Sequence, residues 1–268
     1  MLYVLIFALG LALGSFLNVV ICRLETDESI FFSRSKCPHC GKALKWYELI
    51  PFLSFIIQFG KCRSCGKKIS WQYPSVEIST GFIFLLIFNF QFLNLNFENL
   101  KFLNLVYLLI IISSLLVIFV YDLKYYIIPD KIVFPAIGIS VIYLIFNSFF
   151  VDSYALFINN LFSAIGASGF FLFLVLITKG KGMGLGDVKL AFLMGLVLGW
   201  PGVFLAIFMA VMVGAVFGLF LMLIGRKKIK SQIPFGPFLS GATIFFIIFG
   251  DFVIDYFNNF NFIFLNFI

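Results

Sequence analysis

Runs of about 20 apolar residues recur along this chain, and they limit its possible folds more than any other feature. A run of that length is enough for one helical crossing of a bilayer. Hydrophobic residues make up 62% of the chain and charged residues 12%, against about 45–50% and about 25% in soluble domains. The sequence therefore predicts an all-α polytopic membrane protein with about eight transmembrane helices. The expected spans are residues 2–22, 76–93, 102–121, 130–150, 154–177, 188–204, 205–225 and 235–257.

The basic residues predict how these spans are oriented, because cytoplasmic loops carry an excess of Lys and Arg. If the N-terminus lies outside, the loops after spans 1, 3, 5 and 7 and their helix edges hold 18 of the 19 Lys and Arg residues. We therefore expect both termini outside. The first charge, Arg23, follows the first apolar run, so we interpret that run as an uncleaved span and not as a secretory signal. The net charge of +7 is accordingly attributed to topology and solvated loops beside membrane lipid, with no nucleic-acid partner.

Residues 23–75 form the only substantial soluble part of the expected topology, and they contain two CxxC pairs separated by 21 residues. Two such pairs on glycine-bearing turns are typical of a tetrahedral thiolate site that binds Zn²⁺, although the spacing slightly exceeds the usual range of about 15–20 residues. About fifty residues with few aliphatic side chains do not build a core alone, so a structural metal is physically motivated. The predicted zinc ligands are Cys37, Cys40, Cys62 and Cys65.

Disulfides or a redox-active CxxC pair are the alternatives for these cysteines. The expected cytoplasmic position argues against disulfides. His39, the only histidine, lies inside the first pair and is interpreted as part of that turn, while Cys22 at the end of the first span is interpreted as a packing residue.

The glycine-rich stretch Gly182–Lys189, GMGLGDVK, lies between two long apolar runs. Its glycines let the backbone bend or pack tightly against a neighbour. Asp187 follows them at the mouth of a membrane helix, where a carboxylate costs roughly 2.5–3.5 kcal/mol on insertion scales and is therefore a candidate functional residue. Asp122 ends the span 102–121 on the same side of the membrane and at similar depth. We expect the two aspartates to be partners.

Two carboxylates held together do not both ionise cheaply, so one keeps a proton while the other is charged. The charged member is able to activate water, and the protonated member is able to polarise a scissile carbonyl. This pair predicts peptide hydrolysis without a covalent intermediate. A Ser/His/Asp site would need His39, and no HExxH motif occurs. From the residues alone, a transporter in which these acids bind an ion or a proton remains the alternative.

Taken together, the motifs resemble those of the prepilin peptidases, the bifunctional leader peptidase/N-methyltransferases of type IV pilus and type II secretion systems. The resemblance runs in family order from the first expected span to the last. The segments that carry it are Gly14–Leu24 (GSFLNVVICRL), the two cysteine pairs, Ile50–Phe55 (IPFLSF), Tyr73–Glu77 (YPSVE), Asp122 with Ile128–Asp130 (IPD), Gly182–Leu190 (GMGLGDVKL) and Pro234–Leu239 (PFGPFL).

By this resemblance Asp122 and Asp187 correspond to the two catalytic aspartates of a bacterial inner-membrane enzyme. Its substrate would be a prepilin or pseudopilin whose short basic leader is cut at the cytoplasmic face, just after a glycine. The family's second activity methylates the new N-terminal residue with S-adenosylmethionine, and the cysteine-containing loop is associated with the bifunctional members.

Two departures from the family pattern concern the cytoplasmic loop. Glu25 stands where the family often has Pro, and Phe59-Gly60-Lys61 precedes the second cysteine pair where the family favours an Arg-Gly-Arg context. Gly60, Lys61 and Glu77 are the candidate residues on the methyl-donor side. For Glu77 at the start of a helix, stabilisation by the helix dipole is the alternative explanation.

Tyr121-Asp122 and Gly184–Asp187 also fit the broader YD…GxGD pattern of presenilin-like intramembrane proteases. That interpretation shares the aspartyl chemistry and differs in substrate, and the cysteine loop and PFGP favour the prepilin peptidases. The predicted organisation is a first span (1–22), a zinc-binding lobe associated with methyl transfer (23–75), a transmembrane peptidase core (76–257) and a C-terminal tail (258–268).

Overall fold

The computed structural model describes residues 1–24, 26, 28–30, 32–92, 99–150, 154–180, 183–225 and 233–265. Glu25 and Gly182, which entered the sequence analysis, lie outside these residues, as does the end of the expected tail.

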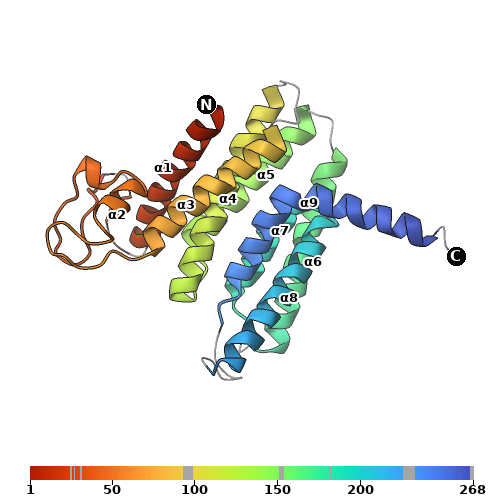
Figure 1. The fold of residues 1–268 in the computed structure, drawn as a ribbon. Coiled ribbons are helices and arrows are strands. Elements are labelled where there is room, and N and C mark those ends of the chain that lie inside the picture. The colour runs from red at the N-terminus through yellow and green to blue at the C-terminus, as the bar shows by residue number, and fades with distance from the viewer. Residues whose placement is uncertain are drawn as a thin grey trace. The chain divides into compact units, whose positions relative to one another are not determined.

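Helices dominate the described part of the chain, which contains no strand beyond two isolated β-bridges, so the all-α prediction is confirmed (Figure 1). The elements are α1 (Leu2–Arg23), η1 (Trp46–Glu48), α2 (Leu53–Ile57), α3 (Gln72–Ile87), η2 (Phe88–Phe92), α4 (Asn99–Tyr125), α5 (Asp130–Phe150), α6 (Tyr154–Ile177), α7 (Leu185–Leu198), α8 (Gly202–Leu223) and α9 (Gly236–Leu265).

Seven helices in the described part of the chain are long and apolar enough to cross a membrane: α1, α3, α4, α5, α6, α8 and α9. The element at the expected span 188–204 is shorter, because α7 has only 14 residues and ends at Leu198. Gly199 then adopts φ +61° and ψ −174°, a backbone conformation that is essentially restricted to glycine. The next helix begins at Gly202, three residues before the expected start of the following span.

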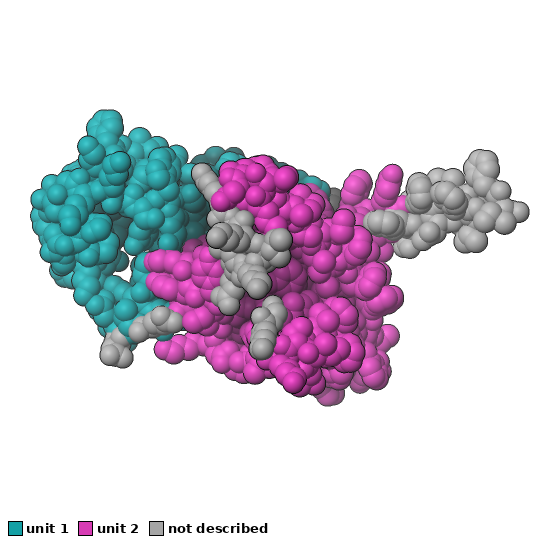
Figure 2. All heavy atoms as spheres, turned by 90° about the horizontal axis from the view of Figure 1, so that it is seen from below, with its two compact units in different colours: residues 1–109 teal, residues 110–268 magenta. Residues whose placement is uncertain are grey.

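The chain divides into two compact units, residues 1–109 and residues 110–268 (Figure 2). In the first unit α1 packs closely on α3 through small residues. A Cβ atom on Gly10 would lie 2.7 Å from the Cα of Gly81, and one on Gly14 would lie 2.7 Å from the Cα of Glu77. Such close contact of backbones is how helices associate in lipid, where there is no hydrophobic drive between them.

In the second unit the short helix α7 is enclosed by α5, α6, α8 and α9. Its closest neighbour is α6, because a Cβ atom on Gly195 would lie only 2.3 Å from the Cα of Ala164. Asn160 of α6 also donates from Nδ2 to the carbonyl oxygen of Leu196 at 2.8 Å. These contacts fix the position of the helix that carries Asp187.

Candidate active site and metal centre

Asp122 lies in the last turn of α4 and is buried, with 4% of its surface exposed. The helix ends three residues later, and Tyr126 turns the chain away with a φ of +59°. The buried ring of Tyr121 packs against Tyr125, with 4.6 Å between ring centroids. The Asp122 carboxylate accepts a hydrogen bond from the backbone N–H of Gly236, the first residue of α9.

Asp187 lies in the first turn of α7, three residues after the N-cap residue Gly184. Its carboxylate accepts a hydrogen bond from the Gly184 backbone N–H, the contact that an acid at this helix position makes in a capping box. An acid in the first turn is further favoured by the helix dipole. The Asp187 side chain is nearly as buried as that of Asp122, with 9% of the residue exposed.

The structure brings the two aspartates within electrostatic reach of each other. Ile128, in the link between α4 and α5, marks where their elements converge. A Cβ atom on Gly186 would lie 3.0 Å from the Ile128 Cβ, and one on Gly236 would lie 3.2 Å from the Ile128 Cδ1 and 2.6 Å from Asp122 Oδ2. The start of α9 therefore approaches Asp122, and the start of α7 approaches Ile128, only because both positions lack a side chain.

An ion pair joins two motifs beside the aspartates. Lys189 of α7 donates from Nζ to both carboxylate oxygens of Asp130, at 2.7 and 2.9 Å, and lies 5.1 Å from the centroid of the Phe134 ring. The pair connects the first turn of α5 to α7, two residues after Asp187.

Gly236, Ile128 and the Asp130–Lys189 pair are the site residues that the sequence analysis did not assign. All lie within the motifs PFGPFL, IPD and GMGLGDVKL. Their position in these motifs could have indicated that they belong to the site. A motif does not show, however, which of its residues contact residues of another motif in the fold.

The four predicted zinc ligands form one cluster in the first unit. Their sulfur atoms lie within 4.8 Å of one another, and Cys37 Sγ is 3.9 Å from Cys65 Sγ. A tetrahedral Zn²⁺ with bonds of about 2.3 Å would place its sulfur ligands about 3.8 Å apart. None of the five cysteines forms a disulfide, and Cys22 lies elsewhere, with its sulfur 3.5 Å from the Tyr73 hydroxyl. The cluster fits a metal such as zinc.

The two cysteine turns have the same backbone structure, which explains why they present sulfur atoms in the same way. Each repeats the sequence Lys-Cys-x-x-Cys-Gly-Lys, and each has a glycine near φ +68°, Gly41 at +69° and Gly66 at +67°. Backbone N–H groups of Cys65 and Ser64 donate to the Cys62 sulfur and lower the pKa of that thiol to about 6. A thiolate is the form that binds a metal.

Comparison with known proteins agrees with both halves of this arrangement. Residues 8–91 match the Bacterial Peptidase A24 N-terminal domain, and residues 109–219 match the Type IV leader peptidase family. The protein named prepilin leader peptidase/N-methyltransferase of Bacillus subtilis (strain 168) is 33% identical over 259 residues, which cover 94% of this chain and 96% of that protein. The chain belongs to the type IV leader peptidase family.

Other members of this family are similar to the chain over most of its length. Proteins of the same name from Stutzerimonas stutzeri and Pseudomonas aeruginosa are 30% and 28% identical, and each match covers 91% of this chain and 89% of the relative. No solved structure matches the chain. These comparisons give no support to a transporter or to a presenilin-like protease, the two alternatives that the sequence left open.

The two family segments divide the sites between them. The N-terminal match contains the cysteine cluster, and the match to residues 109–219 contains both aspartates. Gly236 lies beyond the second match, although it contacts Asp122 directly.

Two of the three candidate residues for binding the methyl donor contact other residues of the first unit. Glu77 is buried, accepts a hydrogen bond from the Phe52 backbone N–H at 2.8 Å and interacts with the Ser15 side chain. Gly60, with a φ of +65°, lies under the ring of Phe55, which a Cβ atom there would approach to 3.1 Å. Lys61 is exposed beside the second cysteine turn. These contacts connect Glu77 and Gly60 only indirectly, through the short helix α2.

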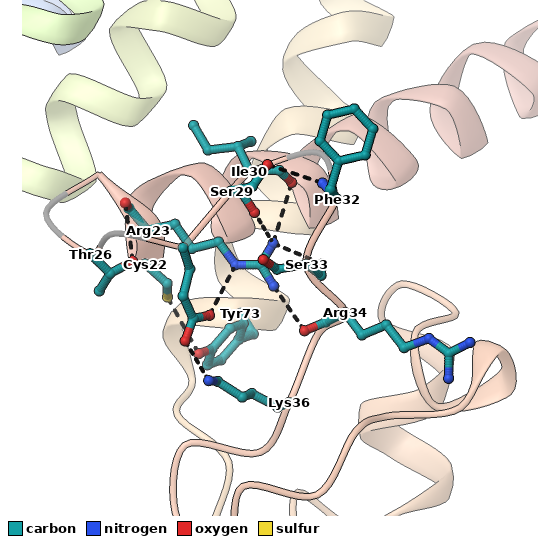
Figure 3. A network of polar contacts seen from close by, with 11 residues as sticks. Cys22, Arg23, Thr26, Ser29, Ile30, Phe32, Ser33, Arg34, Lys36 and Tyr73 are labelled. Atoms are coloured by element: carbon teal, nitrogen blue, oxygen red, sulfur yellow. Dashed lines mark hydrogen bonds and ion pairs between the residues drawn. The ribbon is translucent and has the colours of Figure 1, made fainter.

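A buried arginine holds the start of the cysteine lobe in this family member (Figure 3). Arg23 ends α1, is 8% exposed and has its Nε 3.8 Å from Glu28, which also pairs with Lys36. A guanidinium group has five N–H donors in a fixed planar geometry and can therefore bind several acceptors at once. The terminal nitrogens of Arg23 donate to four backbone carbonyls, those of Ser29 (3.0 Å), Ile30 (3.3 Å), Ser33 (3.0 Å) and Arg34 (3.0 Å).

Proposed function

We propose that this chain removes the leader peptide from type IV prepilins or pseudopilins through Asp122 and Asp187, and that it then methylates the new N-terminus. The observation that carries the proposal is the pair of buried carboxylates from α4 and α7, with the charge of one acting on the other, in a chain of this family. The relatives' printed names state both activities for those proteins.

The geometry supports a general acid–base mechanism shared by two carboxyl groups. Two neighbouring carboxylates share one proton, because the charge of each opposes ionisation of the other. The charged member takes a proton from a water molecule as its oxygen attacks the scissile carbonyl carbon. The protonated member donates a hydrogen bond to the carbonyl oxygen. When the tetrahedral intermediate collapses, the C–N bond breaks and a proton passes to the departing amine.

The proposed location is the bacterial inner membrane, with both termini outside and the cysteine lobe in the cytoplasm. The asymmetry of the basic residues supports this orientation. It places the ends of α4 and α7 that carry the aspartates on the cytoplasmic side, where a basic prepilin leader is retained.

For methyl transfer we propose that the lobe supplies the second activity and that Zn²⁺ stabilises the lobe. S-adenosylmethionine would supply the methyl group. Glu77 and Gly60 are already in contact with Phe52 and Phe55, respectively. Their proposed role is to position α2 and the second cysteine turn, while the exposed Lys61 is the candidate for direct contact with a charged ligand.

The test is co-expression with a type IV prepilin, followed by intact-mass measurement of the pilin. The expected product lacks its leader and carries one added methyl group. Cleavage without the methyl group would contradict the second activity alone. Absence of cleavage for several different prepilins, with the protein inserted in the membrane, would contradict the proposal as a whole.

A further inference from the structure

We propose that the cysteine lobe inserts α2 into the membrane, so that the lobe rests on the anionic headgroups of the adjacent leaflet. The segment Pro51–Phe59 carries α2 in the first unit and is too short to span a bilayer.

The depth of α2 follows from its hydrogen bond to α3, which in turn packs on α1. The backbone N–H of its N-cap residue Phe52 donates to Glu77 Oε2 at 2.8 Å. Glu77 lies five residues inside α3, which corresponds to about 7.5 Å along the helix at 1.5 Å per residue. Glu77 also contacts Ser15, which lies eight residues before the end of α1, or about 12 Å inside that helix.

The lobe-side ends of both spans therefore extend past the start of α2. Figure 1 shows the same arrangement, with α2 beside the end of α1 and not beyond it. Because α1 and α3 are long and apolar enough to cross a membrane, we assign this depth to the boundary between headgroups and acyl chains. Interfacial helices place their apolar face about 5–10 Å into this boundary.

One face of α2 is apolar and is not covered by the described part of the chain. Leu53, Ile56 and Ile57 are 55%, 50% and 62% exposed, and their i, i+3, i+4 spacing places them on the same side of the helix. Phe55 packs the other way, onto Gly60 and onto Trp71 with 5.0 Å between ring centroids. An exposed apolar stripe at this depth is in contact with acyl chains.

The charge and the aromatic residues of the lobe match an anionic lipid surface. Residues 32–71 contain eight Lys or Arg residues and one acid, a net charge of +7. Four thiolates with one Zn²⁺ would reduce this to +5. Trp71 is 74% exposed and directly precedes α3, and Phe59 is 89% exposed. Tryptophan and basic residues are enriched at membrane interfaces, where each basic residue near an anionic leaflet contributes about 1 kcal/mol.

The test uses the full chain in vesicles of phosphatidylethanolamine and phosphatidylglycerol, with and without bromine on the acyl chains. Trp46, Trp71 and Trp200 are changed to Phe, and a single reporter is introduced as Ile57→Trp. Lys67→Trp, in the exposed second cysteine turn, is the matched control. Leu53→Trp is a second reporter on the same face of α2. Bound zinc confirms that the lobe is folded in each variant.

Reporters at positions 57 and 53 are expected to lose about half or more of their emission in brominated lipid, as expected for an apolar face in the acyl boundary, and to resist aqueous iodide. The Lys67→Trp reporter should behave in the opposite way. Equal behaviour of the three reporters would overturn the proposal. Shielding from iodide without quenching by brominated lipid would also overturn it, because a second copy of the chain would then cover α2.

Discussion

Gly236 gives the Asp122 carboxylate both a hydrogen-bond donor and the room to accept it. Its backbone N–H donates to the carboxylate, and a Cβ atom at this position would lie 2.6 Å from Asp122 Oδ2. No real Cβ contact is that short, so an alanine would displace either the carboxylate or the first turn of α9. A carboxylate that acts in proton transfer requires its position to be held within about 0.5 Å.

We therefore expect Gly236→Ala to lower the rate of leader cleavage by about 100-fold, the cost of displacing a reacting group by about 1 Å. Gly138→Ala is the matched control, because nothing lies within 4 Å of a Cβ at that position of α5. The measurement is the cleavage rate of a purified prepilin in proteoliposomes. Wild-type cleavage by Gly236→Ala would exclude this contact from the mechanism.

The cysteine cluster leads to a prediction on metal content. Purified protein should contain about one zinc ion per chain, because four thiolates complete a tetrahedral site. Cys37→Ser combined with Cys62→Ser removes one ligand from each turn and should abolish the bound zinc, whereas Cys22→Ser should retain it. Elemental analysis checks both. A metal-free lobe that remains folded and active would reject the site.

At the scale of the element, α7 is a short helix of 14 residues whose position is determined by packing against its neighbours. Gly195 and Ala164 bring the backbones of α7 and α6 together, and Asn160 binds the end of α7. At the other end an ion pair with Asp130 connects α5 to Lys189, two residues after Asp187. The position of the second aspartate thus depends on packing along the whole helix.

Replacement of Gly195 by Ala should destabilise the second unit by about 1–3 kcal/mol, the usual cost of overpacking. The expected observation is a lower thermal unfolding temperature of the detergent-solubilised protein, together with slower cleavage. Gly169→Ala is the control, since a Cβ there meets nothing within 4 Å. An unchanged unfolding temperature in the Gly195 variant would show that α6 yields to the added methyl group.

The helices themselves were largely predictable from the sequence, because each apolar run of about 20 residues leaves its backbone no alternative to a helix in lipid. The boundary between α7 and α8 was not predictable from hydropathy, because apolar residues continue from Leu190 to Leu223. The tight turn expected at Trp200-Pro201-Gly202 marks the boundary in the sequence, but it does not show that α7 already ends before Gly199, where φ is +61°. Because four other helices surround α7, this helix can be shorter than a span that faces lipid.

At the scale of the whole molecule, the parts of the site that could be predicted from the sequence are those whose residues lie close together along the chain or are placed by the membrane topology. The zinc ligands lie in two short turns of the same sequence, so their spacing in the chain indicates their geometry. Asp122 and Asp187 could be paired because topology places the ends of both spans on one side. The contact of Gly236 with Asp122 and the position of Ile128 beside Gly186 and Gly236 depend on how α7 and α9 pack, and no spacing in the sequence encodes that packing.

The most direct test of the account is the cleavage activity of Asp122→Asn and Asp187→Asn. Each should insert normally in the membrane and leave a co-expressed prepilin at its uncleaved mass, because an amide cannot hold or transfer the proton that the two carboxyl groups share. Asp251→Asn, an exposed acid on α9, should cleave as the wild type does. Full processing by either Asp122→Asn or Asp187→Asn would remove that residue from the mechanism and contradict the two-aspartate account.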